Sequence, residues 1–374
     1  MVLFSLAGIF GGMAVMLAQG IDQSTGTQVA RIATGAAESI RWGAFGSGVA
    51  LAAVGGLAYA ALRGKVTAAV LSLGLVFLVS GDLWRSARSF WVFSDPQAVH
   101  APDRLIELVT ATEQPYRVFN DFDYVYRGSS LMTHGISQLL GHHGNELHRF
   151  DVLLGERNVW QHRGYGIIWD LFAIEWAIIA AGHAPDSLPG FDLVLENHQT
   201  WSGLAANLYR RSEPAQYARL VPGAVKVPDE QAVATVLDPR FSPNRVVLLD
   251  PTAPVNPTPL EEIPEAVPPS VTITSWQPGR MTLHIEPAVE QDTYLMVAEN
   301  WYPDWHARVD GETAPVTRGN QTLITVPVAA GATEVELWFD SGHHRVGKLI
   351  AIVSLLLTAT AIVVPVVLRR RSGG

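Results

Sequence analysis

Two hydrophobic patterns divide this chain. Long apolar runs with few charges cover residues 2–19, 42–62, 66–83 and 348–368. A helix needs about 20 apolar residues to cross a bilayer core of about 30 Å. The runs therefore predict about four membrane spans, three near the N-terminal end and one near the C-terminal end.

The first run, 2–19, has two interpretations. A signal peptide would carry a basic segment before its apolar core and a small-residue cleavage site after it, and neither is evident before Gln19. Gly8, Gly11 and Gly12 instead suit a membrane helix packed closely on neighbours. Residues 20–41 are polar, and we expect an exoplasmic loop there, with 24–39 as a candidate surface helix.

The next two runs form a helical hairpin, because only Arg63, Gly64 and Lys65 separate them. So short a turn makes 42–62 and 66–83 antiparallel. Trp42, Trp84 and Trp91 lie beside these runs, where an aromatic belt at the membrane surface is expected.

Residues 84–250 show mixed periodicities that predict an α/β domain. We expect strands at 116–120, 191–196, 219–227 and 245–250, and short helices at 131–140 and 145–154. The run 167–182 is apolar, but Asp170 and Glu175 interrupt it. It is therefore predicted as a buried helix that continues into a core strand.

A proline-rich segment, 251–269, follows and predicts an extended linker. Beyond it, residues 270–341 read as an antiparallel β-sandwich-like module, in which 299–340 form a β-meander. Side chains at 305–310 alternate between apolar and polar, and Ile324, Val326 and Val328 share one face. The Asp310-Gly311 pair predicts a hairpin turn, because two-residue turns favour positive φ.

Composition narrows the classes of function. The net charge of −9 argues against binding to nucleic acid. Charged residues make up 16% of the chain, and their scarcity is concentrated in the apolar runs. The chain has no cysteine, which excludes disulfides and cysteine-ligated zinc or iron–sulfur centres.

Two acidic residues at the end of a predicted strand, Asp121 and Asp123, are candidate substrate-binding groups. An Asp-x-Asp pair can serve acid–base chemistry or hold a metal-bound sugar nucleotide, and the alternative is a polar loop after the strand. Histidines gather nearby, with Asp151 beside them, but no HExxH or similar spacing organises them into a metal site. The histidines are His134, His142, His143 and His148. The sequence therefore predicts neither a metal nor a cofactor.

Three aromatic residues, Trp301, Tyr302 and Trp305, are further candidates for substrate binding. Their rings could stack on sugar rings, as in carbohydrate-binding β-modules. Alternatively, they plug a gap between the sandwich and its neighbour, because Pro303 makes the turn rigid.

The same segment carries a family resemblance. The pattern comprises NWYPDW at 300–305, VDG at 309–311, Asn320, VP at 326–327 and AG at 330–331, ahead of a strand and a last apolar run. It resembles the C-terminal part of the YfhO-like bacterial membrane proteins. Upstream, AVMLAQGID at 14–22, DLW at 82–84 and RV at 117–118 are similar to the same family.

The resemblance implies a polytopic protein related to the C-type glycosyltransferases, which use polyprenyl-phosphate-linked sugars on the outer membrane face. Their catalytic acidic residue sits in an N-terminal membrane domain that this sequence does not match. Asp22 matches a helix end and not that catalytic loop, so we assign no catalytic residue. The chain is expected to act with a separately encoded membrane glycosyltransferase half, or to be a split or truncated gene product.

The resemblance also places residues 84–347 outside the cytoplasm of a bacterial cell, which the charge distribution alone does not decide. We therefore expect a multi-pass membrane protein that is the substrate-facing part of a glycosyltransferase-like system in cell-envelope glycan assembly. The alternatives are a non-enzymatic glycan-binding or scaffold protein, and a metal-dependent hydrolase using the 121–151 region. Expected partners are the lipid bilayer and a glycan or polyprenyl-phosphate sugar.

Overall fold

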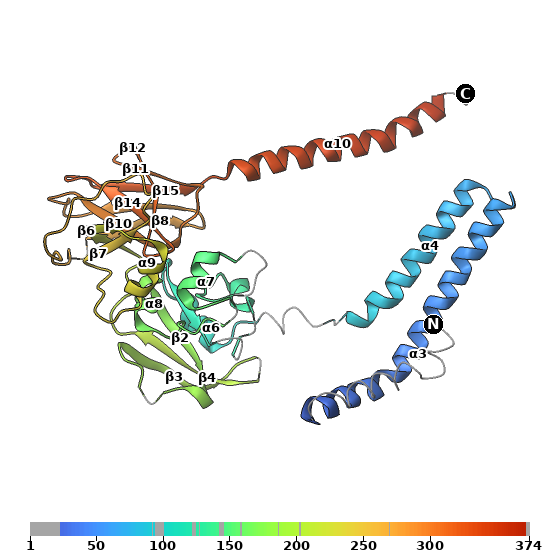
Figure 1. Cartoon of the computed structure of the whole chain (residues 1–374), viewed down its shortest axis with the longest axis horizontal. Helices are drawn as coiled ribbons and strands as arrows, with labels where there is room; N and C mark the ends of the chain where they lie inside the picture. The colour runs from blue at the N-terminus through green and yellow to red at the C-terminus, as the bar shows by residue number, and fades with distance from the viewer. Residues whose placement is uncertain are drawn as a thin grey trace. The chain divides into compact units, whose positions relative to one another are not determined.

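The computed structural model describes residues 23–91, 93, 101–121, 125–126, 128–141, 146–157, 159–185, 187–201, 203–268 and 270–371. The chain divides into two compact units, Met1–Asp95 and Pro96–Gly374 (Figure 1). We describe each unit by itself.

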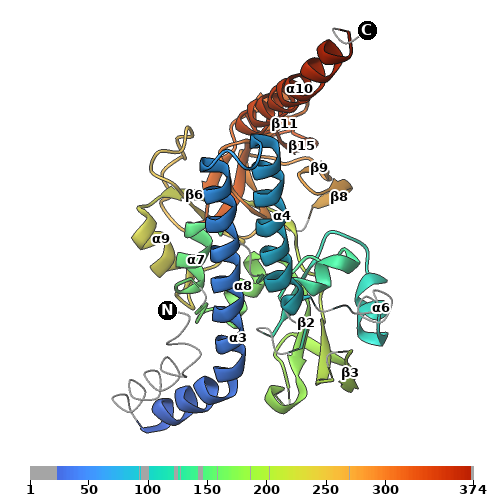
Figure 2. The ribbon, with the colours of Figure 1, turned by 90° about the vertical axis from the view of Figure 1, so that its right-hand side faces the viewer.

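The first unit contains a helical hairpin of α3 (Gln23–Leu62) and α4 (Ala68–Ala87), followed by the short 3-10 helix η1 (Arg88–Phe90). Gly64 turns the chain with a φ of 66°, and the Thr67 hydroxyl caps α4 by accepting from the Val70 N–H at 3.3 Å. The two helices run side by side (Figure 2), and a Cβ on Gly74 would lie 2.7 Å from Leu57 Cδ2. Small residues thus allow the close helix contact.

The apolar parts of both helices are long enough to cross a membrane, at Phe45–Leu62 and Ala68–Arg85. This confirms the spans predicted at 42–62 and 66–83 as apolar helices of the required length. The expected loop at 20–41 is wrong from Gln23 onward, because α3 is already helical there. The segment contains no proline and is rich in alanine, so nothing interrupts the helix. The expected span 2–19 lies outside the described residues.

The second unit begins with a four-stranded sheet in the order β1-β2-β4-β3. Strands β1 and β2 are parallel, and the other pairs are antiparallel. The bounds are β1 (Arg117–Asn120), β2 (Ile174–Ala180), β3 (Phe191–Gln199) and β4 (Ala205–Arg211). One face packs on helix α6 (Arg104–Thr110), whose Leu105, Ile106 and Val109 join Val118 and Ile178 in a buried cluster.

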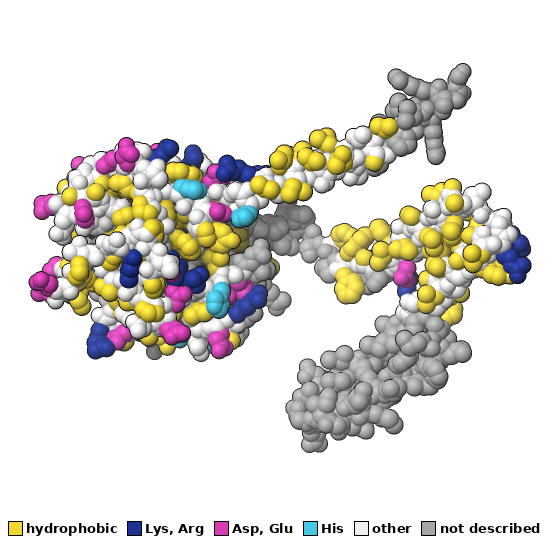
Figure 3. All heavy atoms as spheres, turned by 45° about the horizontal axis from the view of Figure 1, so that its top comes forward, with side chains coloured by type: hydrophobic (Ala, Val, Ile, Leu, Met, Phe, Trp, Pro, Cys, Tyr) yellow, Lys and Arg dark blue, Asp and Glu magenta, His cyan; other side chains and the backbone are white. Residues whose placement is uncertain are grey.

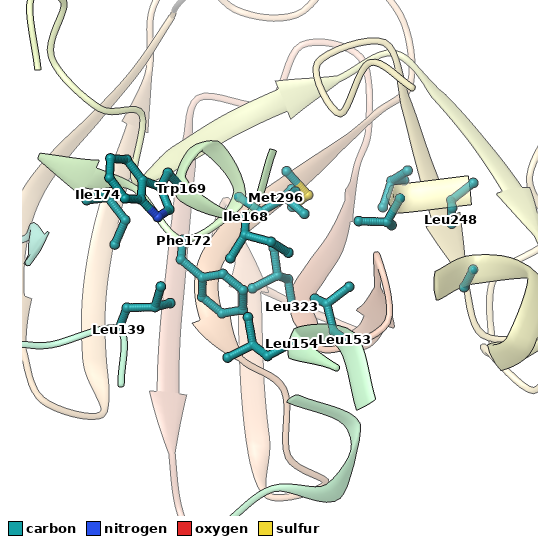
Figure 4. Close-up of a cluster of buried hydrophobic side chains, with 14 of the residues drawn as sticks. Leu139, Leu153, Leu154, Ile168, Trp169, Phe172, Ile174, Leu248, Met296 and Leu323 are labelled. Atoms are coloured by element: carbon teal, nitrogen blue, oxygen red, sulfur yellow. The ribbon is translucent and has the colours of Figure 1, made fainter. Parts of the chain in front are cut away.

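The other face of this sheet shares a core with the next layer (Figure 4). Helices α7 (His148–Leu154) and α8 (Gly166–Leu171) contribute Leu153, Leu154 and Ile168, and the second sheet contributes Met296 and Leu323. Helix α8 is followed by β2, as the apolar run 167–182 predicted. Ala173, with a φ of 53°, separates the two elements.

Two further sheets face each other as a β-sandwich. The six-stranded sheet has the order β5-β10-β14-β13-β7-β6, and the five-stranded antiparallel sheet has the order β12-β11-β15-β9-β8. Leu295, Ile324 and Val326 of the first sheet join Leu283 and Leu337 of the second in one buried core. The strand bounds are β5 (Ala218–Val221), β6 (Gly223–Lys226), β7 (Val246–Leu249), β8 (Val271–Gln277), β9 (Arg280–Ile285), β10 (Thr293–Asn300), β11 (Trp305–Val309), β12 (Glu312–Ala314), β13 (Thr317–Gly319), β14 (Leu323–Val328) and β15 (Glu334–Phe339).

This topology corrects the predicted boundary between an α/β domain ending at 250 and a β-module starting at 270. Strands β5, β6 and β7 lie in the same sheet as β10, β13 and β14, so the sandwich draws strands from both sides of the proline-rich segment. The predicted meander at 299–340 is also wrong, because the chain crosses from one sheet to the other and back. Periodicity identifies strands, but their hydrogen-bond partners lie far apart in the sequence.

The proline-rich segment packs against the sandwich and is not a free linker. The Arg245 guanidinium donates to the carbonyl oxygens of Ile263 at 2.9 Å and Pro264 at 2.6 Å. Lys226 Nζ donates to the Ala253 carbonyl at 2.8 Å, and Val267 packs on the sandwich core. Helix α9 (Asp229–Val236) lies between β6 and β7 in the chain.

Helix α10 (Gly342–Arg371) leaves the sandwich two residues after β15 ends. An ion pair of 3.4 Å between Arg345 and Asp340 ties its first turns to the end of β15. The window Gly342–Ala361 is apolar enough to span a membrane, and hydrophobic side chains cover it in Figure 3. This confirms an apolar C-terminal helix that begins earlier than the predicted 348. The described residues thus contain three candidate spans.

Candidate functional site

A cleft of about 850 Å³ lies between the segment 129–141 with α7 on one side and the end of the sandwich on the other. Aromatic side chains line both walls, and polar groups lie among them. The aromatic residues are Phe150, Trp160, Phe172, Trp276 and Tyr302. The charged and amide residues are Arg117, Gln138, Glu146, Asp151, Glu299 and Asn300.

A buried ion pair fixes the inner part of the cleft. Arg117 opens β1, Glu299 lies near the end of β10, and Arg117 Nη2 is 3.0 Å from Glu299 Oε2. The Tyr217 hydroxyl, just before β5, donates to Glu299 Oε1. The Arg117 guanidinium lies 5.2 Å from the centre of the Tyr217 ring. Three strands therefore hold one carboxylate in a single orientation.

Neighbouring groups satisfy most of the hydrogen-bonding capacity of Arg117 and Glu299. Arg117 also donates to the carbonyl oxygens of Phe172, at 3.2 Å, and Ala298. Burial raises the pKa of Tyr217 above its usual value, so the hydroxyl stays a proton donor to Glu299. A buried charge pair of this kind is stable only when such additional hydrogen bonds are present.

Helix α7 and the loop before it supply the opposite wall. Asp151, 6% exposed, accepts a hydrogen bond from the Trp160 indole N–H at 3.1 Å. Glu146 pairs with Arg157 at the edge of the same wall. The cleft thus combines three carboxylates with one guanidinium.

Gln138 lines the cleft with an amide whose nitrogen is closed to solvent. Its Oε1 lies 3.3 Å from Asn120 Nδ2, and its own Nε2 is buried without a hydrogen-bond partner among the described residues. A buried amide donor without a partner is costly. Because this nitrogen is not exposed in the cleft, a ligand reaches it only if the wall moves.

Of the three aromatic candidates, only Tyr302 lines the cleft. Its side chain is 48% exposed, with its ring 6.1 Å from that of Phe339. Trp301 and Trp305 are half-buried and pack against the sandwich core, with the Trp305 ring 5.6 Å from Phe339. Their burial leaves Tyr302 as the accessible ring.

Asp121, the described member of the acidic pair, is not part of the cleft wall. Asp121 follows β1 and is half-buried, with its Oδ2 3.8 Å from His183 Nδ1. Asp123, like His142 and His143, lies outside the described residues. His134 lies in the 3-10 helix η2 (Ser130–His134), and His148 begins α7. Within the described part of the chain, no three His, Cys, Asp or Glu side chains come close enough to hold a metal ion.

Sequence reasoning missed Arg117, Gln138, Asp151 and Glu299 as members of one site. Arg117 and Glu299 are 182 positions apart. An arginine at the start of an apolar strand, such as Arg117, is a weak signal of a buried charge. Nothing in the sequence shows which residue forms its ion pair.

Searches for similar proteins found no matching family model, curated protein or solved structure. The resemblance to the YfhO-like proteins therefore stays a prediction from sequence motifs.

Proposed function

We propose that this chain is a membrane-anchored glycan-binding protein that serves as the substrate-facing part of a glycosyltransferase-like system in cell-envelope glycan assembly. One observation carries the proposal: the cleft between the α7 wall and the sandwich combines aromatic rings with fixed carboxylates and amides. This composition is the one that sugar recognition requires.

The chemistry of sugars explains this requirement. A pyranose ring has apolar C–H faces that pack on aromatic rings, and a rim of hydroxyl groups that both donate and accept hydrogen bonds. Tyr302 and Trp276 offer rings on the sandwich side of the cleft, whereas Asp151 and Glu146 supply carboxylates on the other. The volume of about 850 Å³ is within the range of small-molecule sites.

The carboxylates favour binding over catalysis by this chain alone. Both oxygens of Glu299 are engaged, one by Arg117 and the other by Tyr217, and Asp151 accepts from Trp160. A general acid or base must exchange a proton with the substrate within hydrogen-bond reach. Groups already held by strong donors serve better as fixed acceptors, so we assign transfer chemistry to a separately encoded membrane half.

We further propose that the part of the second unit that precedes α10 lies outside the cytoplasm. If the three candidate spans all cross the bilayer, the turn Arg63–Lys65 and the tail after α10 share one side, and residues 88–341 lie on the other. Arg63 and Lys65 of the turn, and the three arginines at 369–371, each place several positive charges next to a span. Such charge is favoured on the cytoplasmic side.

Glycan retention tests the proposal. The full chain in detergent would be passed over beads that carry a purified teichoic-acid-type polymer, the class of glycan that the resemblance to YfhO-like proteins implies, and we expect it to be retained. Tyr302→Ala removes an exposed ring without opening the core, so binding should weaken about fivefold to tenfold. Trp201→Ala is the matched control, because Trp201 is 41% exposed and lies outside the cleft. Equal retention of wild type and Tyr302→Ala would contradict the proposed site.

The transferase part of the proposal has its own test. Membranes that contain both this chain and the separately encoded membrane glycosyltransferase half would be supplied with a polyprenyl-phosphate sugar. We expect sugar transfer only when both are present. Absence of transfer with the pair would reject the glycosyltransferase role and leave glycan binding to be judged by the retention assay.

A further inference from the structure

A second cavity, of about 750 Å³, shares no lining residue with the cleft described above. It lies where α8, the segment after β4, strand β5 and the segment after α9 meet. Asp170, Arg211, Arg219 and Asn244 supply its central polar groups, with Tyr165 and Phe241 also in its walls.

Arg219 is buried in this wall without an acidic partner. It lies on β5 and is 7% exposed, and its guanidinium donates to Asn244 Oδ1 at 2.9 Å, to the Gln216 carbonyl at 3.1 Å and to the Asp170 carbonyl. All three acceptors are neutral. No carboxylate of the described residues lies within ion-pair distance of it.

The other buried arginines of the described chain differ in this respect. Arg117 pairs with Glu299, and Arg318, 4% exposed, pairs with both Asp229 and Asp250. A buried cation without a counter-charge is costly, because neutral acceptors replace only part of the stabilisation that water gave it. Arg219 is therefore the exception that requires an explanation.

The carboxylates nearest to Arg219 are already occupied or exposed. Asp170 pairs with Arg211 at 2.7 Å, and Asp238 pairs with Arg240 at 2.6 Å. Glu213, at the cavity wall, is exposed to solvent. Burial lowers the pKa of Arg219 to about 10, an effect that Asp170 opposes and Arg211 adds to. The cavity wall thus carries two guanidinium groups and three carboxylates, and none of these carboxylates pairs with Arg219.

We propose that this cavity binds an oxyanion, the phosphate or carboxylate group of an acidic ligand, on the guanidinium of Arg219 beside the amide of Asn244. A guanidinium donates charge-assisted hydrogen bonds to the oxygens of these groups. Nη2 of Arg219 donates to two carbonyl oxygens and Nη1 to Asn244, so Nε and the second N–H of Nη1 are the donors left for a ligand. The aromatic walls and the volume leave room for the rest of a small ligand. This site is independent of the glycan cleft and does not rest on the proposed function.

Thermal unfolding of the full chain in detergent tests the site. Inorganic phosphate and sodium acetate would each be titrated against sodium chloride at matched ionic strength. A ligand at ten times its dissociation constant should raise Tm by about 3–5 °C. A response to phosphate alone assigns the site to phosphate-bearing ligands, and a response to acetate assigns it to carboxylates. No difference from chloride with either anion would overturn the proposal.

Substitutions test whether the anion-dependent rise in Tm depends on Arg219. Arg219→Met removes the buried charge. We expect this variant to fold, because an apolar residue of similar length replaces an unpaired cation. It should abolish the anion-dependent rise in Tm. Arg219→Lys keeps the charge but loses the guanidinium donors Nε and Nη1, so the dissociation constant should rise at least about fivefold. Arg104→Gln removes an exposed arginine outside this cavity and should respond like wild type. A full response in either Arg219 variant would place the anion elsewhere, and Arg219→Lys decides the matter should Arg219→Met fail to fold.

Discussion

The pair of Arg117 and Glu299 joins two parts of the second unit at the level of single side chains. Arg117 belongs to the four-stranded sheet and Glu299 to the sandwich, so their 3.0 Å contact fixes how the two walls of the cleft face each other. The carbonyls of Phe172 and Ala298 accept from the same guanidinium, which adds backbone contacts from both sides. The site and the fold therefore depend on the same side chain.

Replacing Arg117 should be costly. Arg117→Ala leaves the half-buried Glu299 carboxylate without its counter-charge, and we expect the free energy of unfolding to fall by about 1.5–3 kcal/mol. Denaturant titration of the full chain in detergent measures this change. Arg240→Ala breaks an exposed ion pair with Asp238 and should leave the midpoint unchanged within error. A midpoint for Arg117→Ala that equals this control would show that the pair does not join the walls.

Asp310 gives a pH-dependent prediction. Its carboxylate accepts from the backbone N–H groups of Thr333, at 3.1 Å, and Glu334, at 2.9 Å, and these bonds lower its pKa. A lowered pKa in the folded state contributes stability above the unfolded value of about 3.9. That contribution is lost as the pH falls through the folded value.

The variant Asp310→Asn tests this sign. Asparagine tolerates the positive φ of 46° at this turn but has no charge. We expect Asp310→Asn to be less stable than wild type at pH 7, by less than about 1 kcal/mol because the site is exposed. The two proteins should converge as the pH falls through the lowered pKa of Asp310 in the folded state. Unfolding midpoints between pH 2 and pH 7 measure the difference, and a gap that widens at low pH would contradict the assignment.

At the scale of elements, the hydrophobic pattern and the turn residues correctly predicted features that depend on neighbouring residues in the chain. The run 167–182 became α8 followed by β2, and Asp310-Gly311 became the turn between β11 and β12 with φ values of 46° and 83°. Non-local pairing escaped prediction. Asn320 shows why: its Oδ1 accepts from the Leu248 N–H at 2.9 Å, a contact across 72 positions that places β7 in the sandwich. The same limit applies to the site, whose walls come from segments more than 100 residues apart.

The shared sheet makes a direct prediction about fragments. A fragment of residues 101–250 keeps β5, β6 and β7 but lacks β10, β13 and β14, so its sheet edges and apolar faces are exposed. We expect no cooperative unfolding transition from it, whereas residues 101–341 should unfold cooperatively. Thermal melts followed by near-UV circular dichroism distinguish the two. A cooperative transition in the shorter fragment would restore a domain boundary at 250.

At the scale of the whole molecule, the arrangement of spans determines where the cleft can meet a ligand. The chain has no cysteine, so a single introduced thiol reports its own side of the membrane. Ser275→Cys is exposed on β8, and Lys65→Cys is exposed at the hairpin turn. A membrane-impermeant maleimide should label Ser275→Cys in intact cells, and Lys65→Cys only after permeabilisation. The opposite pattern would reverse the proposed orientation.

The measurement that tests the central claim most directly is hydrogen–deuterium exchange of the full chain in detergent, with and without the teichoic-acid-type polymer. Binding in the cleft should slow exchange in both walls, at residues 135–141 and at 276–279 with 299–302, because these segments line it from opposite sides. The edge strand β3 (Phe191–Gln199) should exchange equally in both samples. Unchanged exchange in both walls, or protection confined to other surfaces, would contradict a glycan site in this cleft.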